Sequence, residues 1–220
     1  MLYKAKQFNL SGLHGISDQT LELHWKLYDG YVQATNNLQE KIADLCRKDQ
    51  FPEHLPTYWA LKQRQAFEYN GMFLHEYYFA NLTRQSSISP DNDSRFFRLA
   101  EKSFGTYALW KGDFIRVGSL RGVGWAICYA DPRSGQISNH WISLHENGHV
   151  AGLQPILVMD VWEHAYLLDY KPAERNKYIN AFFSHVDWNV VDARIQGKSS
   201  RDYDSAANQP SADSHVTTPA

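Results

Sequence analysis

The sequence predicts an α+β fold, in which an N-terminal antiparallel helical hairpin precedes an α/β domain with a three-stranded antiparallel sheet. Two observations predict it. Two long helical patterns lie within the first 82 residues, and after residue 117 the apolar period changes from that of a helix to that of a strand. We expect the hairpin domain within 1–88 and the α/β domain within 95–196. The polar remainder, 197–220, is expected to be a disordered tail.

The two helices of the hairpin are predicted over about 18–48 and about 57–82. Ser17 and Asp18 provide an N-cap signal for the first helix. A polar stretch with a proline, 84–94, separates this hairpin from the next domain. The apolar residues predicted to be buried in the first helix are Leu21, Leu23, Leu27, Tyr31 and Leu38, and those in the second are Trp59, Leu61, Phe67, Phe73, Tyr77 and Leu82.

In the second domain, helical patterns resume over about 95–117. Residues 124–130 are strand-like, 131–135 form a turn, and 136–144 return as a second strand, which together predict a β-hairpin. A third strand ending at Met159 would bring Asp160 to a junction between a strand and a helix. Helices over about 173–184 and 187–195 would complete the fold.

The bulk composition argues against several function classes. A net charge of −2 gives no general attraction to nucleic acid or to an acidic membrane surface. There is no apolar run of the roughly 18 residues that a membrane-spanning helix needs, and the first residues lack the apolar core of a secretory signal. The two cysteines, Cys46 and Cys128, cannot form a disulfide scaffold, so we expect reduced thiols in a cytoplasmic protein.

The most informative motif runs from Asp160 to Tyr166, with the sequence Asp-Val-Trp-Glu-His-Ala-Tyr. In a helix, the step from Asp160 to His164 would place both on one face, about 6 Å apart along the axis. An oxygen and a nitrogen ligand at this spacing can share one metal ion. The apolar run 156–159 precedes this carboxylate, and a buried charge needs a partner or a metal. The alternative is an ordinary Asp/His pair on a half-exposed helix.

This motif resembles the signature of the iron/manganese superoxide dismutase family. The similarity covers about residues 10–195, and shorter matches follow in order at 104–107, 122–125, 186–188 and Arg194. The resemblance implies one iron or manganese ion per subunit. It also implies that the protein converts superoxide to oxygen and hydrogen peroxide as a homodimer, with a tetramer as the alternative. The implied metal ligands are His24, His75, Asp160 and His164.

The resemblance implies catalytic roles for Tyr31 and His145. Tyr31 matches the gateway tyrosine of the family, but it follows His24 by seven residues instead of the usual eight. We expect this deletion to remove a π-bulge and to leave the Tyr31 hydroxyl at the site on a straight helix. His145 would bond the metal-bound solvent, with His149 as the second candidate and a plain polar loop residue as the alternative. Iron-type members of the family often have a glutamine at the position of Gly71. A small residue there is expected if His145 supplies the hydrogen bond to the metal-bound solvent instead.

Further residues are implied to surround the metal pocket. Phe67, Trp125 and Trp162 match the aromatic residues that line it, although core packing explains them equally well. Glu163 matches the acid that bonds a ligand histidine of the neighbouring subunit, and Tyr166 would lie beside it at the interface. Arg175 matches a basic residue at the substrate mouth.

A second departure from the family concerns Tyr28 and Leu167. The family often has a histidine at the first position and, at the second, a tyrosine that pairs with it from the other subunit. Both are absent here, and Tyr28 could fill the vacated space with its ring and hydroxyl. One alternative is therefore a catalytically silent metal-binding relative, in which these changes have broken the proton path.

The other alternative is a zinc metallohydrolase, because 145–149 spells the His-Glu-x-x-His motif of zinc proteases. That chemistry requires a helix, whereas Asn147-Gly148 is one of the strongest turn signals, so this reading is disfavoured. The sequence does not choose between iron and manganese, because the Irving–Williams order and the cellular supply of metals outweigh the effect of the ligands.

Overall fold

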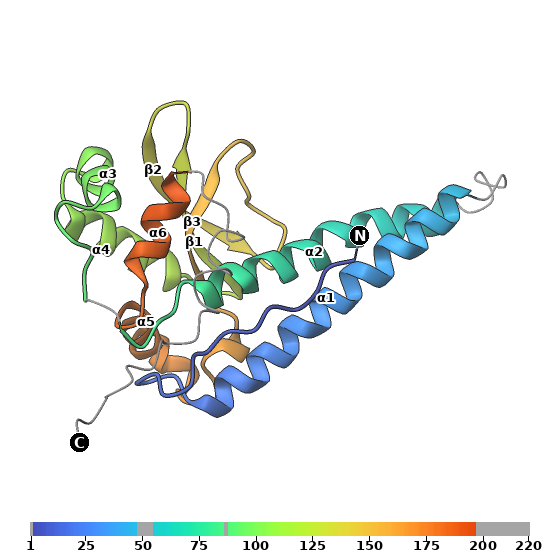
Figure 1. The fold of residues 1–220 in the computed structure, drawn as a ribbon, viewed down its shortest axis with the longest axis horizontal. Helices are drawn as coiled ribbons and strands as arrows, with labels where there is room; N and C mark the ends of the chain where they lie inside the picture. The colour runs from blue at the N-terminus through green and yellow to red at the C-terminus, as the bar shows by residue number, and fades with distance from the viewer. Residues whose placement is uncertain (1, 48–54, 86–87, 197–220) are drawn as a thin grey trace, which may run out of the picture.

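The computed structural model describes residues 2–47, 55–85 and 88–196 (Figure 1). Helix α1 (Asp18–Arg47) and helix α2 (Leu55–Ala80) form the hairpin, which extends well beyond the body of the molecule. The segment before α1 runs along this hairpin. The Trp25 indole donates to the Lys6 carbonyl at 2.8 Å, and the Tyr3 amide donates to Asn36 Oδ1 at 2.8 Å. The predicted hairpin is therefore confirmed.

Helix α1 begins where the sequence predicts, because the Thr20 amide donates to Ser17 Oγ at 3.1 Å. Its buried face differs from the predicted one. Leu23 and Leu27 are 48% and 37% exposed, and Trp59 of α2 is 70% exposed, so these three predictions were wrong. The apolar pattern misled because the stripe facing the core contains polar and aromatic side chains. The buried residues of α1 are Thr20, Leu21, His24, Tyr28, Val32, Thr35 and Leu38.

The helical region predicted over 95–117 is two helices, α3 (Arg95–Phe104) and α4 (Tyr107–Gly118). The chain breaks at Gly105, whose φ of +88° is left-handed backbone. The side chain of Thr106 then accepts from the Leu109 amide and caps α4.

The three-stranded antiparallel sheet is confirmed, and β1 is its central strand. Its strands are β1 (Gly124–Asp131), β2 (Gln136–Ser143) and β3 (Gln154–Asp160), in the order β2-β1-β3. In this register Trp125 lies opposite Asp160 on one side and Ile142 on the other. The start of β1 therefore places an indole ring beside the end of β3.

The chain continues through two short 3₁₀ helices, η2 (Glu163–Ala165) and η3 (Pro172–Glu174), to α5 (Arg175–Phe183) and α6 (Trp188–Ile195). Buried Arg194 of α6 donates to the Asn81 side chain and to the Ile156 carbonyl. Asn81, just after α2, donates to the Val158 carbonyl at 2.6 Å. These bonds hold the end of α2 against β3.

No helix among the described residues is both long and apolar enough to cross a lipid bilayer. The proposed domain limits, 1–88 and 95–196, stay predictions. The tail predicted over 197–220 lies outside the described residues.

Candidate metal centre

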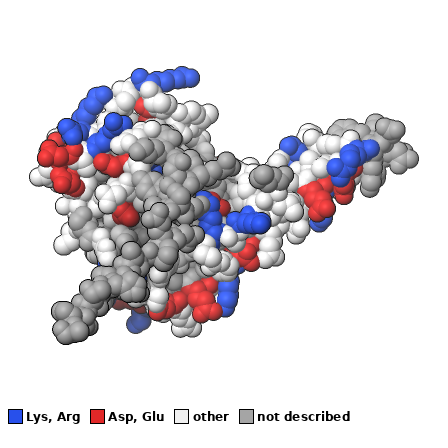
Figure 2. Space-filling view, viewed as in Figure 1, with Lys and Arg blue, Asp and Glu red and all other residues white. Residues whose placement is uncertain are grey.

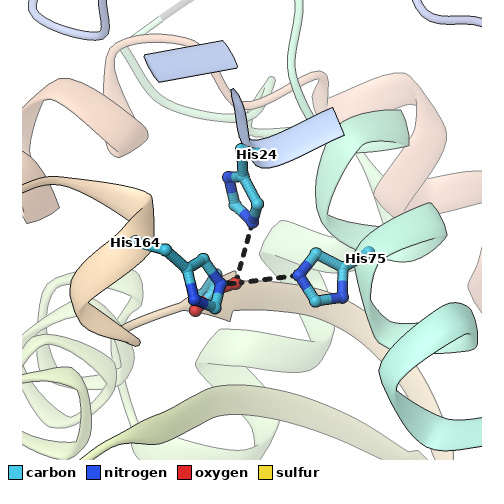
Figure 3. A group of neighbouring side chains, drawn as sticks. His24, His75 and His164 are labelled. Carbon is cyan, nitrogen blue, oxygen red and sulfur yellow. Dashed lines mark hydrogen bonds and ion pairs between the residues drawn. The ribbon is translucent and has the colours of Figure 1, made fainter. Parts of the chain in front are cut away.

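Four side chains from four separate elements meet where the hairpin packs on the sheet (Figure 3). His24 comes from α1, His75 from α2, Asp160 from the end of β3 and His164 from η2. One ligand atom of each lies within 4.8 Å of those of the other three. The Nε2 atoms of His24 and His164 are each 3.0 Å from Asp160 Oδ2, and that of His75 is 3.6 Å away. Residues separated by 140 positions are thus brought to one point.

Residues 160–164 do not form an α-helix. Asp160 ends a strand, and His164 lies in a 3₁₀ turn after the extended residue Trp162 (φ −65°, ψ 154°). The Trp162 amide donates to Asp160 Oδ1 at 2.7 Å, so the carboxylate forms an Asx turn before η2 and leaves Oδ2 for the histidines. The strand predicted to end at Met159 extends one residue further, since β3 pairs with β1 as far as Asp160, and a 3₁₀ turn follows where a helix was expected.

The donor set fits a metal ion. His75 Nδ1 lies 2.6 Å from the Gly71 carbonyl, which can only accept, so this nitrogen carries the ring proton. The lone pair of Nε2 then faces the Asp160 carboxylate, and this buried nitrogen has no hydrogen-bond partner. Ligand atoms about 2.1 Å from one ion are separated by about 3.0 Å at a right angle and about 3.6 Å at 120°. The three distances from the histidine nitrogens to Asp160 Oδ2 have these values. A cation between them would therefore remove the unfavourable contact between the lone pair of His75 Nε2 and the Asp160 carboxylate.

Burial and charge favour the ligand forms of these groups. Burial would raise the pKa of Asp160, but the charges and hydrogen bonds of His164 and His24 outweigh it and hold that pKa below its ordinary value. Burial lowers the pKa of His24 and lowers that of His75 strongly. The carboxylate is therefore ionised and both buried imidazoles are neutral near pH 7, as metal binding requires.

Tyr31 and His145 lie next to this cluster and bond to each other. The Tyr31 oxygen is 2.7 Å from His145 Nε2, and the Trp125 indole donates to His145 Nδ1 at 3.0 Å. Because Nδ1 accepts, the neutral ring carries its proton on Nε2 and donates it to Tyr31. Burial lowers the pKa of His145 to about 4, so the ring is neutral near pH 7.

The expected consequence of the seven-residue spacing in α1 is observed. Helix α1 is α-helical throughout, and Tyr31 turns inward, with its ring stacked on His75 at 5.2 Å between centroids. Gly71 makes room for this ring. A Cβ added there would lie 2.6 Å from Tyr31 Cδ1, far inside normal contact.

The predicted aromatic residues surround these groups. The rings of Phe67 and Trp162 lie 4.6 Å and 4.8 Å from that of His145, and Trp125 lies 5.0 Å from His75. Trp125 is fully buried, whereas Phe67 and Trp162 are half-buried. The inner part of the site is therefore shielded from bulk solvent, and its outer edge reaches solvent.

The Tyr28 ring is fully buried and lies 6.5 Å from that of His75 between centroids. Its hydroxyl accepts from the Lys6 amide at 2.9 Å and donates to Glu76 at 3.1 Å, which leaves it bonded to the N-terminal segment and α2. Leu167 is 39% exposed.

The remaining predicted residues lie around η2. Glu163 is exposed, and Tyr166 is buried within the chain. Glu163, Tyr166 and Arg175 line one cavity of about 610 Å³. The Arg175 guanidinium donates to the Tyr166 hydroxyl and to the carbonyls of Leu120 and Gly122. Arg175 thus fixes the loop before β1.

The His-Glu-x-x-His segment forms a turn, as Asn147-Gly148 predicts, and not the helix that a zinc protease needs. His145 is buried, whereas His149 is exposed and its Nε2 donates to the His145 carbonyl at 2.9 Å. The two imidazoles do not share a ligand position.

Two tyrosines that support the site were not identified from the sequence. The Tyr178 hydroxyl donates to the Asp160 carbonyl at 2.7 Å, and the Tyr78 ring lies 4.9 Å from that of His24. Tyr178 lies 18 positions from Asp160, and no pattern links them. Only the packing of α5 on the sheet reveals this contact.

Comparisons with known proteins all point to one family. Residues 93–194 match the family model for the C-terminal domain of iron/manganese superoxide dismutases. The iron superoxide dismutase of Aquifex pyrophilus is 33% identical over 187 residues, which cover 84% of this chain and 86% of that protein. Manganese superoxide dismutase 2 of Haloferax volcanii is 34% identical, with 82% and 87% covered. The iron superoxide dismutase of Cupriavidus metallidurans is 31% identical, with 89% and 97% covered.

Proposed function

Since this chain belongs to the iron/manganese superoxide dismutase family, we propose that it is an enzyme that dismutates superoxide at one bound iron or manganese ion. Two superoxide ions and two protons would give oxygen and hydrogen peroxide. The observation that carries this proposal is the convergence of three imidazole nitrogens on Asp160 Oδ2. The proposed ligands are His24, His75, Asp160 and His164.

A bound iron or manganese ion would supply the one-electron oxidation and reduction that dismutation requires. The surrounding residues would hold protons and exclude water. Burial raises the pKa of Tyr31 to about 12, so its hydroxyl keeps its proton near pH 7. Because that oxygen accepts from His145, its own proton remains available to donate. We propose Tyr31 as the proton donor and His145 as the residue that orients it.

We further propose a cytoplasmic homodimer, with a tetramer as the alternative. Leu23 and Leu27, one turn apart on α1, and Leu167 expose apolar surface that a second copy could cover. Cys46 and Cys128 are both free, in agreement with a reducing compartment.

Metal content and superoxide consumption, measured on the same purified sample, test the proposed function. We expect about one iron or manganese ion per chain and a second-order rate far above that of spontaneous dismutation. Bound iron or manganese without turnover would support a silent relative. Zinc as the sole metal, with hydrolytic activity, would support the metallohydrolase and overturn the proposal.

The metal-free protein is expected to lose stability as the pH falls below about 6.5. The unfolded chain protonates His24 and His75 there, whereas burial holds both neutral in the folded state. Each such proton steepens the loss by about 1.4 kcal/mol per pH unit. Asp160, with its lowered pKa, adds a further loss below about pH 3.8.

Urea unfolding between pH 7.5 and 5 measures this dependence. His75→Gln is expected to make it shallower by about one proton, whereas His14→Gln, at an exposed site, serves as the control. Equal pH slopes for the wild type and His75→Gln would contradict the burial argument.

A further inference from the structure

A row of residues on one face of α2 leads away from the metal centre, and it includes the cation Arg64. Arg64, Glu68, Gly71 and His75 follow each other at steps of four, three and four, so they share one face of the helix. His75 stands at the metal centre and Gly71 beneath the Tyr31 ring. Arg64 lies about 16 Å from His75 along the axis, at the outer end of this face.

Arg64 is held in place by two contacts. Its Nε donates to Glu68 Oε1 at 2.6 Å, and its guanidinium lies 3.9 Å from the centre of the Phe67 ring. Phe67 in turn contacts His145 at 4.6 Å and Tyr31 at 6.2 Å between ring centroids. A salt bridge and a cation–π contact therefore fix a positive charge over the aromatic ring that borders the proton-donating pair.

The pair has its positive end toward solvent. The Arg64 side chain is 55% exposed, whereas that of Glu68 is 11% exposed. The carboxylate lies behind the guanidinium, so an approaching anion meets the cation first. The low exposure of Glu68 also means that loss of Arg64 would leave an unbalanced negative charge near the site.

The charge of Arg64 lies at a partly exposed edge of the site. His24, His75, Asp160 and His145 are buried. Around them, solvent reaches Tyr31, Phe67 and Trp162, which are half-buried, and the His164 side chain, which is 25% exposed. Phe67 belongs to this open edge, and Arg64 covers its ring.

The electrostatic reach of Arg64 extends to both members of the proton-donating pair. Burial is the main reason that the pKa of His145 falls and that of Tyr31 rises. The charge of Arg64 lowers the pKa of both groups, against the raising effect of Glu68 on Tyr31. An anion beside Tyr31 would therefore feel the same charge.

On the basis of the proposed function, we propose that Arg64 steers superoxide to the metal centre. The molecule as a whole provides little attraction, with a net charge of −2. Figure 2 shows acidic and basic side chains interspersed over the visible face, without a broad basic region. A local cation at the partly exposed edge of the site would then raise the concentration of a small anion there.

The test compares Arg64→Gln with Arg64→Lys and Glu68→Gln in the metal-loaded protein. The matched control is Arg47→Gln, which removes the same charge from another exposed helical ion pair, about 24 Å along α1 from Tyr31. We expect Arg64→Gln to lower kcat/KM for superoxide about threefold or more at low ionic strength and to flatten its dependence on salt. Arg64→Lys should restore most of the rate, and Glu68→Gln should not lower it.

A second readout does not depend on turnover. Azide, a small monovalent anion, is titrated against the metal-loaded protein by its absorption change. Its dissociation constant should rise about threefold in Arg64→Gln and stay unchanged in Arg47→Gln. Equal effects of the two substitutions on kcat/KM and azide binding would overturn the role of Arg64. A wild-type protein that consumes no superoxide but binds azide through Arg64 would refute the proposed activity alone.

Discussion

Replacing Asp160 by asparagine is expected to remove both the bound metal and the superoxide-consuming activity. All three histidine nitrogens face one oxygen of this carboxylate, at 3.0, 3.0 and 3.6 Å. Asparagine keeps the shape of the side chain but carries no charge, so a cation held by the three imidazoles would lose the negatively charged member of the cluster. We expect metal content to fall below about a tenth of the wild-type value and the rate by about a thousandfold or more.

Asp169→Asn is the matched control for this substitution. Asp169 is also partly buried and accepts from the Ser17 amide at 2.9 Å and from the Thr20 hydroxyl at 2.8 Å, but it is not a member of the metal cluster. Its loss should reduce the free energy of unfolding by about 1–2 kcal/mol and leave metal content unchanged. Elemental analysis and rate measurements on both variants decide the matter. Full metal occupancy in Asp160→Asn would show that the cluster is not the metal site.

The second large effect is expected from a single methyl group at Gly71. In Gly71→Ala the new Cβ would lie 2.6–2.9 Å from three atoms of the Tyr31 ring, so the ring must move. The 2.7 Å bond between Tyr31 and His145 would then break or lengthen. Because proton donation depends on this position, we expect kcat to fall about tenfold or more while metal content remains near one per chain.

Gly30→Ala provides the control in the neighbouring helix. A Cβ at Gly30 meets no atom within 4 Å, so the substitution should give only the helix preference of alanine, about 0.5–1 kcal/mol of added stability. In Gly71→Ala the same gain is opposed by overpacking of about 1–3 kcal/mol. Urea unfolding and steady-state kinetics of the two variants separate the effects. An unchanged kcat in Gly71→Ala would mean that the position of Tyr31 does not limit turnover.

The sequence predicted the order of the elements well, because the period of the apolar residues and the turn residues are local signals of helices and strands. It failed at positions where an apolar residue is exposed or a polar residue is buried. Leu23 and Leu27 are apolar yet exposed, while His24 and Thr35 of the same helix are buried. The break at Gly105 was also missed, since a glycine alone does not reveal a positive φ.

For the site, the sequence by itself determined which side chains could bind a metal, because Asp160, His164 and the two upstream histidines lie in family motifs at matching positions. Only the tertiary structure decided how they meet. The pairing of β3 with β1 carries the strand one residue past Met159 to Asp160, and Tyr178 of α5 secures the Asp160 backbone. Arg64 lies over Phe67 because both residues stand on the part of α2 that leads away from the metal centre. Most of these contacts join residues that are far apart in the chain. A local sequence pattern shows which face of an element is apolar, but it does not show which other element will pack against that face.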